Sequence, residues 1–134
     1  MSLATEDRHI YSADTARYVP VQRGSTTLFV EKVPRLTIPA EEIATVVLKH
    51  RQPDSSSSYD VIFALLPSGA RRVAEFTAQQ VGRYIEVRFG DTSLGVPRIV
   101  APVGDGTIQG HLSGLPPERV HAAFAGLGSK VTWK

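Results

Sequence analysis

The sequence has no cysteine among its 134 residues, and aromatic side chains make up only 7% of it. Without cysteine the chain cannot be a small domain stabilised by disulfides, and a zinc site with cysteine ligands is excluded as well. A chain of this length buries roughly two thirds of the surface that it exposes when unfolded, so it needs neither kind of crosslink to hold a core. We therefore expect one ordinary globular fold.

Long hydrophobic runs are also missing. The longest uncharged apolar stretch, Val61–Leu66, has the length of a strand, whereas a membrane helix needs about 20 apolar residues. The first ten residues include Glu6, Asp7 and Arg8, which is unlike a signal peptide. We expect a chain that does not span a membrane by itself. It is either cytoplasmic or an envelope domain whose signal or anchor has been removed.

The sequence also lacks a large excess of charge of one sign, because it has 15 basic and 13 acidic residues. Arg71 and Arg72 form the one adjacent Lys/Arg pair, on a predicted helix. Nucleic-acid-binding proteins usually have a dense basic stripe with aromatic residues among it. The composition therefore argues against nucleic acid as a partner.

Runs of β-branched and aromatic residues, bounded by glycine and proline, predict short strands. The expected strands are 26–30, 59–65, 84–89, 96–103, 107–112 and 131–133, with 45–48 either a strand or the end of a helical turn at 40–43. Apolar residues spaced as in a helix predict two main helices, at 68–81 with Ser68 as its cap and at 117–127. The serine-rich segment 52–58 is expected to be a hairpin loop.

These elements predict an α+β fold, with a mainly antiparallel sheet of about six or seven short strands and the two helices packed on one face. Residues 1–18 have no periodic apolar pattern, so we expect a flexible N-terminal arm or an edge element there. The single domain would then comprise residues 19–134.

Residues suited to catalysis do not form a recognisable pattern. The four histidines, at positions 9, 50, 111 and 121, lack the spacing of a metal site, and no Gly-x-Ser-x-Gly motif is present. Glu41 and Glu42 are helix neighbours that point about 100° apart, so they cannot converge on one bond. We predict no catalytic, cofactor or metal residues and a non-enzymatic function. The alternative is an enzyme whose site is assembled from distant residues.

Several segments, taken together, resemble a known family. They occur in the family's order: Leu28–Thr37, Glu42–Ile43, Tyr59–Leu65, Ser68–Thr77, Val81–Arg83, Val96–Val103, Ile108–Leu112 and Pro117–Val120. This order is similar to that of the first periplasmic (head) domain of SecD, which with SecF forms the accessory complex of the bacterial preprotein translocase. The turn at Phe89-Gly90-Asp91 departs from the family's Leu-Asp-Gly, and the family's transmembrane helices are absent.

The resemblance implies a mobile, non-catalytic head domain in the periplasm or cell envelope that contacts translocating chains. Its partners would be an unfolded polypeptide or an envelope protein. The alternative is a cytoplasmic binding module with no role in secretion.

An exposed strand edge is the surface on which a non-native chain can pair. The proline-interrupted segment 96–103 and the first predicted strand provide such edges. The candidate peptide-binding residues are Val96, Arg98, Ile99, Val100 and Phe29. Prolines at an edge also protect against aggregation, so an ordinary blunted edge strand is the alternative interpretation.

Overall fold

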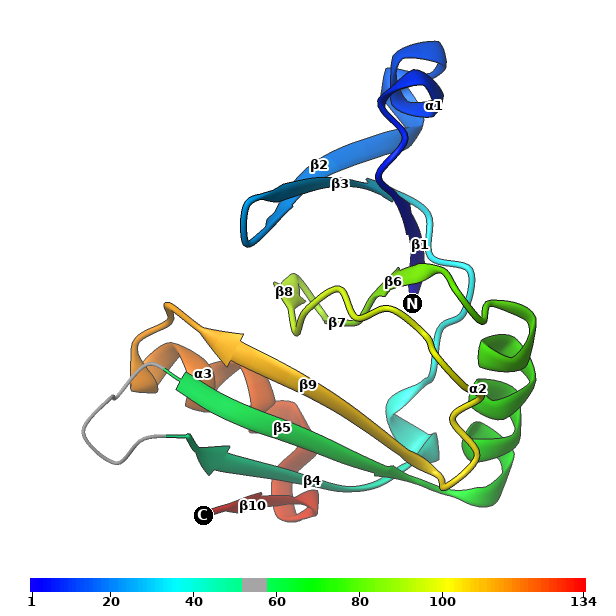
Figure 1. The fold of residues 1–134 in the computed structure, drawn as a ribbon. Helices are drawn as coiled ribbons and strands as arrows, with labels where there is room; N and C mark the ends of the chain where they lie inside the picture. Colours follow the sequence, from blue (N-terminus) through cyan, green and yellow to red (C-terminus); the bar gives the residue numbers. More distant parts are fainter. Residues whose placement is uncertain (52–57) are drawn as a thin grey trace.

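The strands of the protein form two four-stranded sheets and a small hairpin (Figure 1). The computed structural model describes residues 1–51 and 58–134. The strands are β1 (Ser2–Thr5), β2 (Tyr18–Arg23), β3 (Thr26–Glu31), β4 (Ile43–His50), β5 (Ser58–Leu65), β6 (Tyr84–Glu86), β7 (Arg88–Phe89), β8 (Thr92–Ser93), β9 (Thr107–Ser113) and β10 (Val131–Trp133). The helices are α1 (Arg8–Ala13), α2 (Pro67–Gln79) and α3 (Pro117–Phe124), with 3-10 turns η1 (Thr15–Arg17), η2 (Ala40–Glu42) and η3 (Ala125–Lys130).

Sheet A has the strand order β2-β3-β1-β6, and sheet B the order β10-β4-β5-β9. Neighbouring strands are antiparallel except β10, which runs parallel to β4. In Figure 1 sheet A, with the β2–β3 hairpin and α1, lies above sheet B. The segment 32–39 leads from one sheet to the other, and α2 stands at the side of both.

The predicted α+β class is confirmed, with two main helices and mainly antiparallel strands. Consecutive strands form hairpins at β2–β3, β4–β5 and β7–β8. The valine-rich segment 45–48 is part of strand β4, as its β-branched residues favour. The expected hairpin loop at 52–58 lies almost entirely outside the described residues. The prediction did not separate the strands into two sheets, because strand signals in a sequence do not identify their partners.

The predicted ends of the helices need correction. Leu66, and not Ser68, occupies the cap position of α2, because Pro67 takes the first helical position, where its missing N–H is not needed. The Ser68 hydroxyl instead donates to the Glu42 carboxylate at 3.2 Å. Helix α3 ends at Phe124, and the chain continues as a 3-10 turn to Lys130.

The expectation of a flexible arm is wrong for residues 2–5. They form β1, an inner strand of sheet A that pairs with β3 on one side and β6 on the other. Ser2 and Leu3 are buried there. The segment carries little local strand signal, and its order comes from partners far away in the sequence. That residues 19–134 form a single domain remains a prediction.

The main core lies between sheet B and α3. The inner face of the sheet and one side of the helix contribute most of it, and η3 and the residues that follow β6 and β8 contribute the rest. The core residues are Ile43, Val46, Leu48, Tyr59, Val61, Phe63, Val87, Leu94, Leu112, Val120, Phe124 and Leu127. The rings of Phe89 and Phe124 stack at 4.7 Å between centroids, with planes 1° apart. Thr45 and Lys49, on the outer face of β4, are exposed, as expected for an antiparallel sheet that has one face in contact with solvent.

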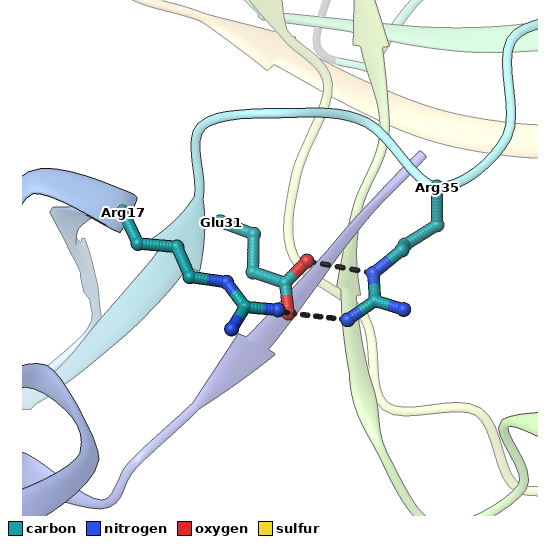
Figure 2. A network of polar contacts seen from close by, with 3 residues as sticks. All are labelled: Arg17, Glu31 and Arg35. Atoms are coloured by element: carbon teal, nitrogen blue, oxygen red, sulfur yellow. Dashed lines mark hydrogen bonds and ion pairs between the residues drawn. The ribbon is translucent and has the colours of Figure 1, made fainter. Parts of the chain in front are cut away.

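A nearly buried carboxylate ends strand β3. The Glu31 side chain accepts two hydrogen bonds from Arg35, at 2.7 and 2.9 Å, and a longer one from Arg17 at 3.4 Å (Figure 2). The hydrogen bonds from Arg35 hold the pKa of Glu31 below its usual value, and the charges of Arg35 and Arg17 act in the same direction. The two hydrogen bonds from Arg35 hold residues 31–35 as a short loop. They therefore fix the point at which the backbone leaves sheet A.

Candidate functional site

The segment 94–103, called the strap here, leaves the β7–β8 hairpin, runs along β6 and reaches α2 (Figure 1). Sequence analysis predicts a strand over 96–103, and the structure contradicts this. Within those residues the pairing is a single bridge between Arg98 and Tyr84. Pro97 has no N–H to offer a ladder, and the chain bends away toward α2.

Backbone hydrogen bonds nevertheless hold one edge of the strap against β6. The Ile85 N–H donates to the Pro97 carbonyl at 2.9 Å, and the Ile99 N–H donates to the Arg83 carbonyl at 2.8 Å. Because backbone groups alternate in direction along an extended chain, those of Val96 and Arg98 face away from β6. The second edge of the strap, with these backbone groups, therefore points away from β6.

One buried hydroxyl attaches the far end of the strap to helix α2. Thr77 is fully buried, and its Oγ1 accepts the Val103 N–H at 2.9 Å while donating to the Val73 carbonyl at 2.8 Å. The sequence places Thr77 on the apolar stripe of the helix, and the structure gives its hydroxyl a partner outside the helix. This bond fixes the end of the strap relative to α2.

Replacing Thr77 by valine is expected to release that end. Valine keeps the shape of the side chain but leaves the Val103 N–H without an acceptor, which costs about 1 kcal/mol. Amide hydrogen exchange at Val103 is the measurement, and we expect it to speed up about fivefold, the equivalent of 1 kcal/mol. Unchanged exchange at Val103 would show that the hydroxyl does not hold the strap.

The near end of the strap is attached to sheet B. The N–H of His111, on edge strand β9, donates to the Leu94 carbonyl at 2.7 Å. Leu94 is 1% exposed, and it lies directly on Gly110. The strap and β9 are thus joined at Leu94 and diverge from there.

A groove of about 290 Å³ lies beyond this junction. The strap lines it with residues 97–101 and 103, β9 with residues 107–109, α2 with Val73 and Thr77, and β6 and the residue after it with Ile85 and Val87. Most of these side chains are apolar. Two edges of extended chain, those of the strap and of β9, therefore border one shallow apolar groove.

The groove has one charged residue of each sign, Arg98 and Asp105. The Arg98 Nε donates to the Gly82 carbonyl at 3.2 Å. The N–H and hydroxyl of Thr107 both donate to Asp105, and these bonds lower the pKa of its carboxyl. Asp105 is therefore ionised at neutral pH, and the charges of these two side chains balance each other. The N-terminal residue Met1 lines the groove as well.

The structure brings three of the five predicted binding residues together. Arg98, Ile99 and Val100 line the groove, and Val100 is 82% exposed. Val96 is buried next to them in sequence. Phe29 is 4% exposed on β3, stacked on Tyr11 of α1 at 4.4 Å, so the accessible apolar tip expected there is not found.

The other groove residues were not predicted from the sequence. Thr77 and Gln109 belong to elements that were predicted correctly, α2 and β9, but nothing local shows that these elements face the strap. The prolines at 97 and 102 were the one local signal, and they lie in the strap that borders this groove.

In 1–51 and 58–134, no group of three or more His, Asp or Glu side chains is placed to hold a metal ion. Over the same ranges, no helix has both the length and the apolar character needed to cross a membrane.

No protein-family model and no curated protein sequence matches the chain. Among solved structures, it is similar to a chain described as belonging to SecDF, a membrane component that enhances protein export. The two share 14% sequence identity and a TM-score of 0.48, over 91% of this chain and 81% of the other. At this level the similarity assigns no function and no residue role, and membership of the SecD family remains a prediction.

Proposed function

We propose that this chain is a non-enzymatic module that binds an extended segment of polypeptide in the groove between the strap and β9. The observation that carries this is that the edge of the extended strap and the edge of strand β9 border one apolar groove. An added strand forms main-chain hydrogen bonds with such an edge, while its side chains occupy the adjacent apolar surface. This mode of binding suits an unfolded chain, because main-chain pairing requires no particular sequence.

The composition of the groove supports binding without catalysis. Its ionisable side chains, Arg98 and Asp105, are each already engaged by neighbouring groups. Acid-base or nucleophilic catalysis needs two groups that converge on a reacting atom, and the lining residues offer no such pair. We therefore propose a binding role and not an enzymatic one.

The proposed setting is the periplasm or cell envelope, as a secretion-accessory module. The order of the segments that resemble the SecD head domain supports this. Fractionating cells that express the complete gene, against markers for cytoplasm and envelope, tests the location. Recovery in the cytoplasm would favour the alternative of a binding module without a role in secretion.

Changing Ile99 or Val100 to aspartate is expected to weaken peptide binding about tenfold, which corresponds to 1.4 kcal/mol. Either change places a charge on the apolar wall of the groove, where a bound side chain would have to desolvate it. The probe is a labelled peptide of alternating valine and threonine flanked by lysines, titrated by calorimetry. Val100 is largely exposed, so Val100→Asp should fold normally.

Val33→Asp is the matched control, because Val33 is 74% exposed and does not line the groove. Its affinity for the peptide should equal that of the unchanged protein. Equal affinity of all three variants would place binding elsewhere, and no binding to the unchanged protein would refute the function itself. A peptide N-methylated at alternate amides should bind more weakly if the main chain pairs with a strand edge.

A further inference from the structure

A second pocket, of about 400 Å³, lies between the two sheets. The inner face of sheet B contributes Ile43, Phe63, Leu65 and Ile108, and the connecting segment 34–38 contributes a wall. Residues 86–90 of β6 and β7 provide another wall. The pocket has the size of a small-molecule site.

Its interior is apolar and firmly held. Phe63 is buried in the main core, and Phe89 is fixed by its stacking on Phe124. Rings held in place in this way give a preformed surface, which loses little entropy when a ligand binds. The pocket therefore suits an aliphatic or aromatic body.

The polar groups gather on one part of the lining, at Lys32, Glu86 and Arg88. Glu86 is buried, and it is already bonded by Arg88 Nε at 2.8 Å and by the Ser93 hydroxyl at 3.1 Å. These two charges cancel each other. Lys32 has no ion pair within 4.0 Å among the residues that the structure describes. Met1 also lines the pocket, and its N-terminal ammonium donates to the Leu36 carbonyl and is attracted by Glu86. Within the described ranges, Lys32, which is exposed, is thus the lining side chain whose positive charge has no carboxylate partner.

The network in Figure 2 fixes the backbone on either side of Lys32, because Glu31 precedes it and Arg35 follows it. The hydrogen bonds between Glu31 and Arg35 close a short loop that contains Lys32 and Pro34. Lys32 and Pro34 both line the pocket. Arg17 and Arg35 together outweigh Glu31 by one positive charge. The neighbourhood of Lys32 therefore attracts an anion.

We propose that this pocket binds a small anionic amphiphile, such as a medium-chain carboxylic acid, with its apolar chain against Phe63 and Phe89 and its carboxylate at Lys32. The observations that carry this are a partly open pocket with an apolar interior and a lysine without an ion-pair partner on its lining. A neutral apolar ligand would leave the cation unused, and a cationic one would be repelled. The pocket adjoins the peptide groove, with which it shares Met1, Val87 and Ile108, but the proposal does not depend on the function proposed there.

The test compares octanoate with octanamide, which has the same chain but no charge. We expect octanoate to bind the unchanged protein and to shift the backbone NMR signals of residues 36–38 and 86–90. Lys32→Gln should weaken octanoate binding about tenfold and leave octanamide binding as it was. Lys49→Gln, on the exposed outer face of β4, is the matched control and should change neither.

Leu36→Trp should fill the pocket and abolish the binding of both compounds. Since this variant changes packing, its circular dichroism is compared with that of the unchanged protein, and Lys32→Gln provides the test that does not alter packing. Equal binding of octanoate and octanamide, or no effect of Lys32→Gln, would overturn the proposed carboxylate contact. Absence of octanoate binding at millimolar concentration would overturn the site. Ile99→Asp should leave octanoate binding intact, which separates this site from the peptide groove.

Discussion

Replacing Gly110 by alanine is expected to destabilise the protein by about 2–3 kcal/mol, because the new methyl group has no space. A Cβ at this position would lie 2.7 Å from the Leu94 Cβ and 3.0 Å from the Leu94 carbonyl oxygen. Neither atom can move away by a change of rotamer. The carbonyl is also the acceptor for His111, so the strap would have to separate from β9. Urea unfolding at neutral pH measures the loss.

Gly126→Ala is the control for that substitution. No atom lies within 4 Å of the Cβ that it would add, and its backbone does not need a positive φ. We expect this variant to be as stable as the unchanged protein or slightly more stable, since alanine restricts the unfolded chain. If Gly110→Ala were equally harmless, the close approach of the strap to β9 would be refuted.

Changing Glu31 to glutamine is expected to cost about 2–3 kcal/mol at neutral pH, because the charged hydrogen bonds from Arg35 and Arg17 are lost within a nearly buried site. The amide retains one acceptor oxygen but no charge. Glu41→Gln, at an exposed carboxylate in η2, is the control and should change stability little.

The same carboxylate predicts a dependence of stability on pH. Its pKa in the folded protein lies below the ordinary value of 4.5, so its contribution is complete above pH 4.5 and is lost as the pH falls through the folded value. The difference between the unchanged protein and Glu31→Gln should therefore shrink between pH 5 and about pH 3. A difference that stayed constant over this range would show that the charge of Glu31 is not what stabilises the fold.

The sequence predicts the parts of the fold whose signals are local. Strands β3, β5 and β9 have β-branched and aromatic runs, and α2 and α3 have apolar residues with helical spacing. Strand β1 escaped prediction because Ser2–Thr5 has one large apolar residue, and its order comes from two partners in sheet A. The division into two sheets is likewise a matter of partners, which periodicity does not specify.

The candidate sites were predictable to a smaller extent. The prolines of segment 96–103 drew attention to the segment that borders the proposed groove, although the segment is a strap and not a strand. The anchor at Thr77 and the contact of Leu94 with Gly110 depend on residues that only the tertiary fold brings together. Phe29 was predicted to be accessible, but it is buried under α1. An isolated aromatic residue in a strand gives no sign of the helix that covers it. Lys32 gave no signal, since a single lysine is ordinary on any surface.

The central place of β1 in sheet A has a consequence for the order of folding. Ala4 pairs with Val30 on one side and with Tyr84 on the other, so one of its two partners lies 80 positions along the chain. Strands β4 and β5 are neighbours in sequence and can pair early, whereas sheet A must wait until β6 is available. During synthesis the chain therefore holds β1 and β3 without their last neighbour while sheet B begins to form. In this period the edge of β1 that β6 will occupy is open to pairing with another chain.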